Sequence, residues 1–181
     1  YKIYFANEII EQFMLTANET VAEKFFWLDA PFIYRVHEAP DIEKVTELNM
    51  FLFNLGYSVK CTKDEVHPTA FAKVLEEVKG KPEERVISNL ILRTLKVARY
   101  ESQNKGHFGI ASKYYCHFTS PIRRYPDLFI HRIITKYIES GYNLSESQIE
   151  KYNAQATKYA ETSSERERIA QKVERESVDI K

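Results

Sequence analysis

The chain has 181 residues, the length of one domain, with 26 Lys and Arg residues against 26 Asp and Glu residues. This balance excludes a protein whose overall field attracts nucleic acid, so any RNA or DNA contact must come from a local patch. The two cysteines exclude a disulfide framework and favour a reducing compartment. Because there is no signal-like start and no membrane-spanning apolar run, we expect a cytoplasmic protein without a membrane partner.

Elements of the first half follow from periodicity and turn residues. Apolar residues at helical spacing predict a helix over residues 1–28, with Asn18 on a solvated face and a stop at Pro31. Residues 32–36 are β-branched and aromatic between prolines, which predicts a strand. Asp41 should cap the next helix. The further elements that we predict are a helix at 42–55, a short strand at 57–59, helices at 68–78 and 83–98, and extended segments at 108–111 and 114–118.

The densest functional stretch runs from Thr119 to Asp127. Thr119 and Ser120 can cap a helix whose first residue is Pro121. Arg123 and Arg124 would then lie in the first turn, beside free backbone N–H groups and the positive end of the helix dipole. This combination attracts phosphate, and for these two arginines we favour a phosphate role over a structural one.

The predicted central helix continues with apolar residues on two sides. Pro126 should kink or restart it. Beyond Pro126, two apolar rows indicate a helix that is buried on two sides. The rows are Phe129, Ile133 and Tyr137, and Ile130, Ile134 and Ile138.

Polar residues of this helix share one face. Arg124, Asp127 and His131 have spacings that place them together. Asp127 and His131 fit a satisfied internal salt-bridge network as well as a functional role, because buried charges must be paired in either case. The same alternatives apply to Arg35, His37 and Glu38, which can contact a ligand or form a hydrogen-bonded structural cluster.

The C-terminal region is predicted to be one long helix. Ser145 and Glu146 start it, and it runs to about Ile180, with a strongly charged part over 161–176 that is solvated or packed on something outside the sequence. We predict no metal site, because the Cys and His spacings do not match paired zinc ligands and the aspartates are scattered. The sequence also lacks a glycine-rich phosphate loop.

One long motif identifies a family. It consists of His107-Phe108-Gly109, Tyr115, His117-Phe118-Thr119-Ser120-Pro121-Ile122-Arg123-Arg124-Tyr125-Pro126-Asp127-Leu128 and His131-Arg132. This motif resembles the signature of the RNB family of ribonucleases. Two further stretches agree in order and interval, namely Leu15 to Ala22 with Tyr34-Arg35-Val36-His37-Glu38, and Glu174-Arg175.

The resemblance implies a magnesium-dependent, processive exoribonuclease that threads single-stranded RNA into a closed channel and releases nucleoside monophosphates from the 3′ end. It places Arg123 and Arg124 at the scissile phosphate as catalytic residues, with Arg123 stabilising transition-state charge. Glu174 would approach the terminal nucleotide, although Glu176-Ser177-Val178 departs from the family's Asp-Val. The expected RNA-binding residues are Thr119, Ser120, Tyr125, Glu174, Arg175, His107, Arg35 and His37. Those expected to support them are Asp127, His131, Arg132, Tyr34 and Glu38.

The family's aspartate-rich magnesium motif and its base-stacking aromatic lie upstream of the matching region and do not occur in this sequence. The cold-shock-like domains and the S1 domain are also missing. We therefore expect residues 1–181 to be the C-terminal part of an RNB catalytic domain, inactive alone, without bound Mg²⁺, and prone to self-association through exposed half-domain surface. The parent fold is α+β, a mixed sheet surrounded by helices, and this part should be mostly α-helical with a few short strands. Two alternatives remain, a non-catalytic RNA-binding or scaffold module of the same fold and a helical interaction domain.

Overall fold

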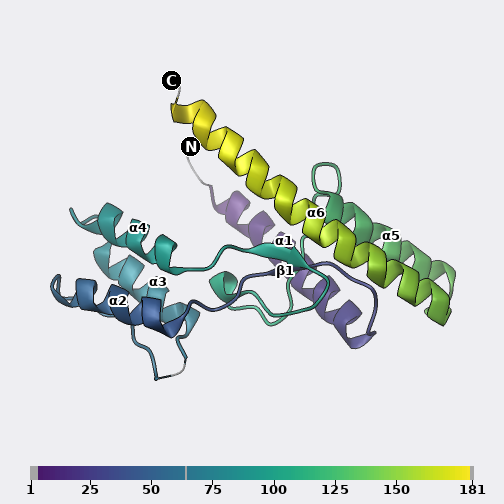
Figure 1. The fold of residues 1–181 in the computed structure, drawn as a ribbon, viewed down its shortest axis with the longest axis horizontal. Helices are drawn as coiled ribbons and strands as arrows, with labels where there is room; N and C mark the ends of the chain where they lie inside the picture. The colour runs from purple at the N-terminus through teal and green to yellow at the C-terminus, as the bar shows by residue number, and fades with distance from the viewer. Residues whose placement is uncertain (1–3, 64, 180–181) are drawn as a thin grey trace. The chain divides into compact units, whose positions relative to one another are not determined.

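The structure is a computed structural model that describes residues 4–63 and 65–179. Over these residues the chain is mostly helical with a short antiparallel sheet, as predicted. Among the described helices, none has the length and apolar character that crossing a bilayer requires. In chain order the elements are α1 (Phe5–Trp27), β1 (Tyr34–Val36), α2 (Ile42–Phe53), α3 (Pro68–Val78), α4 (Glu84–Thr94), β2 (Arg99–Glu101), the 3-10 turn η1 (Phe108–Ile110), α5 (Tyr125–Glu139) and α6 (Glu146–Asp179) (Figure 1).

The described chain divides into two compact units. The first contains residues 4–36, 99–106 and 113–179, and therefore α1, the sheet, α5 and α6. The second contains residues 37–98 and 107–112, and therefore α2, α3, α4 and η1. Each unit has its own apolar core.

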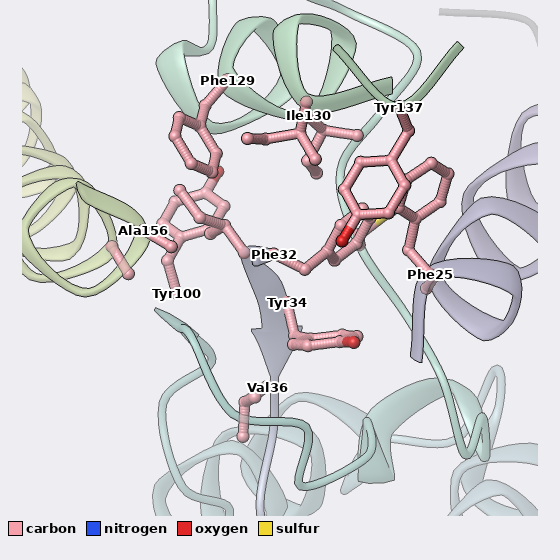
Figure 2. Packing of buried hydrophobic residues seen from close by; sticks show 14 residues of the cluster. Phe25, Phe32, Tyr34, Val36, Tyr100, Phe129, Ile130, Tyr137 and Ala156 are labelled. Atoms are coloured by element: carbon pink, nitrogen blue, oxygen red, sulfur yellow. The ribbon is translucent and has the colours of Figure 1, made fainter. Parts of the chain in front are cut away.

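The core of the first unit lies between the sheet and three helices. Figure 2 shows Phe25 from α1, Tyr34 from β1, Phe129 from α5 and Ala156 from α6 converging on it. The rings of Phe25 and Phe32 stack at 5.4 Å between centroids. Because α6 presents the small side chain of Ala156 here, that helix can pack closely alongside α5 (Figure 1). This core supports the segments that form the site described below.

The second unit is a cluster of three helices in which His37 links residues that are far apart in the sequence. His37 is buried, with Nε2 2.6 Å from the carbonyl oxygen of Lys96, while the Gly109 N–H donates to its Nδ1 at 3.0 Å. A Cβ atom at Gly109 would lie 2.8 Å from that Nδ1, so only glycine fits. Asp41, predicted to cap α2, makes no capping hydrogen bond and instead pairs with Lys96 at 2.8 Å.

Two predicted elements are wrong, and a predicted helix is present but shorter than expected. Residues 57–59 form no strand, because the Asn49 side-chain amide satisfies the N–H and carbonyl of Val59 at 2.7 and 2.9 Å in place of a partner strand. The helix predicted over 83–98 ends at Thr94, and β2 follows it. Residues 108–110 form a 3-10 turn instead of an extended segment.

Candidate functional site

A buried asparagine in α1 positions the segment that leads to α5. The Asn18 side chain donates to the Tyr115 hydroxyl at 3.2 Å and accepts from the Phe118 N–H at 3.0 Å. The backbone carbonyl oxygen of Asn18 accepts from the Cys116 thiol at 3.2 Å. The predicted solvated position for Asn18 is therefore wrong, and its amide satisfies a backbone N–H of this segment, whose Tyr115 carbonyl oxygen accepts from the Arg35 N–H of β1 at 2.9 Å.

The central helix begins later than predicted. Its first residue is Tyr125 and Arg124 is the N-cap residue, so the helix starts next to Pro126, in agreement with the predicted restart at this proline. Residues 121–123 form a turn in which the N–H groups of Arg123 and Arg124 donate to the carbonyl oxygen of Ser120 at 3.3 and 3.2 Å. Arg123 and Arg124 therefore precede the helix and do not lie in its first turn.

Asp127 explains this displacement. Its side chain is fully buried, and Oδ2 accepts from the Ser120 N–H at 2.8 Å and from Arg124 Nε and Nη2 at 3.1 and 2.8 Å. This carboxylate holds Ser120 against the first turn of α5, so the residues between them must form a loop. Arg124 is accordingly engaged in an internal ion pair.

His131 lies apart from that ion pair. Its Nε2 lies 3.0 Å from the carbonyl oxygen of Phe118, and its ring stacks on the Phe118 ring at 4.2 Å. The predicted apolar rows also differ from each other. Phe129, Ile133 and Tyr137 are all buried. In the second row Ile130 is buried and Ile134 packs against the core, whereas Ile138 is 60% exposed, so α5 is buried on two sides only in its first part.

A cavity of about 850 Å³ lies beside the loop that carries Arg123. One wall is a helical stripe of α6, and the others come from β2 and from residues 117–126. Its lining residues are Tyr100, His117, Arg123, Arg124, Tyr125, Pro126, Tyr159, Thr162, Ser163, Arg166, Glu167 and Ala170. Arg123 and Arg166 are exposed, and neither has a carboxylate partner among the residues described.

Tyr100 joins the sheet to His117 and to α6. Its hydroxyl lies 2.9 Å from Nδ1 of His117, and its N–H donates to the hydroxyl of Ser164 in α6 at 2.9 Å. Burial raises the pKa of Tyr100 to about 12. The phenol therefore keeps its hydrogen-bonding proton at pH values at which an exposed tyrosine would already ionise.

Arg35 and Glu167 form a two-point ion pair at this wall. Arg35 Nη1 lies 2.6 Å from Oε2 of Glu167, and Nη2 donates to Oε1 at 3.0 Å. The guanidinium carbon also lies 4.6 Å from the ring centroid of Tyr100, its cross-strand neighbour. Glu167, the carboxylate that lines the cavity, is thus neutralised by a side chain of β1.

The aromatic wall is formed by two tyrosines. The ring of Tyr125, 41% exposed, meets that of Tyr159 edge-on at 4.9 Å. Burial and Tyr159 raise the pKa of Tyr125, while Arg132 opposes this by favouring the charged phenolate. Arg132 does not line the large cavity.

The structure brings together only part of the predicted set. Glu174 and Arg175 are exposed and lie beyond Ala170, the last lining residue of α6. Tyr34 is buried in the core of the first unit, and Thr119 and Ser120 are half-buried beside the cavity without lining it. His37, Glu38 and His107 belong to the second unit, whereas the residues around the cavity all come from the first unit.

Five lining residues were given no role in the site by the sequence analysis, although His117 lies in the family motif. They are Tyr100, His117, Tyr159, Arg166 and Glu167. The spacing of Tyr159, Ser163, Arg166 and Ala170 is a helical stripe that could have been found. In a helix charged on most sides, however, that stripe does not stand out.

Comparison with known proteins identifies the family. Residues 1–140 match the family described as RNB domain. The chain belongs to the RNB family. Ribonuclease R of Thermotoga maritima is 44% identical over 176 residues, covering 97% of this chain and 25% of that protein. Ribonuclease R of Aquifex aeolicus is 44% identical over 179 residues, covering 99% and 25%.

Solved structures named RNase R resemble this chain over nearly its whole length. The apo form of Mycoplasma genitalium RNase R superposes with a TM-score of 0.89 at 32% identity, covering 99% of this chain and 28% of that one. The same protein in complex with ribose methylated single-stranded RNA gives 0.88. This chain spans about a quarter of the length of the Thermotoga and Aquifex proteins, both of which are named ribonuclease R.

Proposed function

We propose that this chain supplies the phosphate-binding side of the active site of an RNB exoribonuclease that degrades single-stranded RNA from the 3′ end to nucleoside monophosphates. The observation that carries the proposal is Arg123, an exposed arginine without a carboxylate partner among the described residues, on a loop fixed beside a large cavity. The ribonuclease R names of the relatives support the reaction class, and the RNA complex of a similar structure supports the substrate class.

Arg123 and Arg124 would have different roles. Arg124 is fixed by Asp127 and holds the loop in place. Arg123 would contact the scissile phosphate and stabilise the charge that develops there, because a cation held in position before the reaction needs little reorganisation. The rings of Tyr125 and Tyr159 at the cavity wall offer surfaces on which bases can stack.

We further propose that the protein works processively in the cytoplasm with Mg²⁺ held by residues outside this chain. The described residues do not fit a metal site themselves, since no three His, Cys, Asp or Glu side chains among residues 4–63 and 65–179 converge to hold an ion. Asp127, the buried acid of the site, is committed to Arg124. The chain alone should therefore not hydrolyse RNA.

The test compares 3′-end shortening of 5′-labelled single-stranded RNA in Mg²⁺ by this chain and by the protein in its full native length. The full-length protein should shorten the RNA and the chain should not. Arg123→Gln should abolish shortening, whereas Arg168→Gln, an exposed arginine of α6 that does not line the cavity, should leave it intact.

Other results would change the proposal in defined ways. Degradation by the 181 residues alone would show that they contain a complete active site and would refute that part of the proposal. RNA binding without cleavage at full length would favour the non-catalytic RNA-binding module. A full-length protein that neither binds nor cleaves RNA would refute the proposal entirely.

A further inference from the structure

The Arg35–Glu167 pair is a two-point polar contact at the cavity wall. Both Nη atoms of Arg35 are engaged by the two oxygens of Glu167, and only 11% of the arginine side chain is exposed. The guanidinium also lies over the Tyr100 ring at 4.6 Å. An arginine held along one edge by a carboxylate and on one face by a ring has little capacity left for another anion.

The charges around the cavity show what this pair does. Three arginines and one glutamate line it, and the buried Asp127 already neutralises Arg124. Arg123 and Arg166 are left as cations without carboxylate partners among the described residues. Glu167 is 32% exposed, so without Arg35 it would present a bare negative charge to any phosphate in the cavity.

We propose that Arg35 promotes RNA binding by neutralising and positioning Glu167, and that it does not contact the RNA itself. This inference rests on the proposed function, since it names how one residue supports that same site. It replaces the sequence-based expectation that Arg35 binds RNA directly. Arg35 is in this sense a positioning residue, and its effect on RNA is transmitted through Glu167.

A rescue experiment tests the inference. The protein in its full native length would be titrated, without Mg²⁺ so that no RNA is cleaved, into fluorescent single-stranded RNA followed by anisotropy. Arg35→Gln should weaken binding by about tenfold, the effect of one uncovered charge acting through partly exposed surroundings. Arg35→Gln combined with Glu167→Gln should return the affinity to within about threefold of the unmodified protein.

The competing explanations give different results. If Arg35 contacted phosphate, or if the pair only held the fold together, the double variant would bind as weakly as Arg35→Gln or more weakly. That result would overturn the inference. Glu167→Gln alone should bind at least as tightly as the unmodified protein, and a loss of affinity there would overturn it as well, even if Arg35→Gln fails to fold.

Two controls separate this inference from the proposed function. Arg123→Gln should weaken binding whether or not Glu167 is substituted, and Arg168→Gln should not. If Arg123→Gln weakens binding and the double variant is not rescued, only the role of Arg35 is refuted. If the unmodified protein does not bind RNA, the proposed function fails first.

Discussion

Asp127→Asn tests whether one buried carboxylate fixes the loop that carries Arg123. The substitution keeps the size of the side chain and removes its charge. In the folded protein, Oδ2 of Asp127 accepts three hydrogen bonds, one from the Ser120 N–H and two from the Arg124 guanidinium. An amide oxygen can still accept from Ser120, but it leaves Arg124 without its counter-charge.

The structure sets the expected size of the effect. Removing one partner of a fully buried ion pair costs about 3–5 kcal/mol, because the remaining charge is left uncompensated. The Arg124 side chain is 18% exposed, so water can solvate part of it. We therefore expect Asp127→Asn to lower the free energy of unfolding by about 2–4 kcal/mol.

The chain contains a matched control on the same helix. Lys136 and Glu139 form a second ion pair three residues apart, at 2.7 Å against 2.8 Å for Arg124 and Asp127, but both side chains are about half exposed. Urea unfolding followed by circular dichroism should show a large loss for Asp127→Asn and almost none for Glu139→Gln, because exposed pairs are well solvated. Equal losses in the two variants would refute the reasoning from burial. An unchanged stability in Asp127→Asn would refute the anchoring of the loop.

The remaining predictions concern the hydrogen bonds of Asn18, the phenol of Tyr100 and the exposed apolar face of α1. Asn18→Ala removes the side-chain hydrogen bonds to the Tyr115 hydroxyl and from the Phe118 N–H in the protein interior, so urea unfolding should show a loss of about 2–4 kcal/mol; a loss no larger than that of an exposed asparagine replaced by Ala would contradict this role of Asn18. The raised pKa of Tyr100 means that, above pH 10, the unfolded chain releases a proton that the folded chain keeps. Stability should therefore fall as pH rises from 10 to 12, less steeply in Tyr100→Phe than in the exposed control Tyr142→Phe, and identical slopes would exclude this cause. The isolated chain should self-associate through α1, where Phe13 is 68% exposed. Sedimentation should show smaller species for Phe13→Glu, and a chain that is monomeric throughout would refute this expectation.

The parts of the fold that could be predicted have strong local signals. Pro68 and Gly80 bracket α3, and its predicted bounds match the observed ones. The start of α5 could not be read in this way. Pro121 gives a good local signal for a helix start, but the buried Asp127 holds Ser120 by a contact that overrides it.

Strand β2 and the cavity wall on α6 depend on distant partners. Arg99–Glu101 pairs with β1 across residues 37–98, and a three-residue strand has almost no periodicity of its own. Glu167, not Glu174, lines the cavity because of where α6 packs on the sheet. In a 34-residue helix rich in Glu, Arg and Lys, the sequence does not reveal that register.

The register of the small sheet has a consequence for the evolution of this chain. Val36 and Arg99 are direct partners at one end of the β1–β2 ladder, and between them the chain leaves to build α2, α3 and α4 before it returns. In topological terms residues 37–98 are an insertion at the tip of a hairpin, a place where a two-residue turn could join the strands. Insertions at such positions can lengthen, shrink or diverge without altering the strands that carry Arg35 and Tyr100. Changes of length within residues 38–98 should therefore leave the wall of the arginine-lined cavity unchanged.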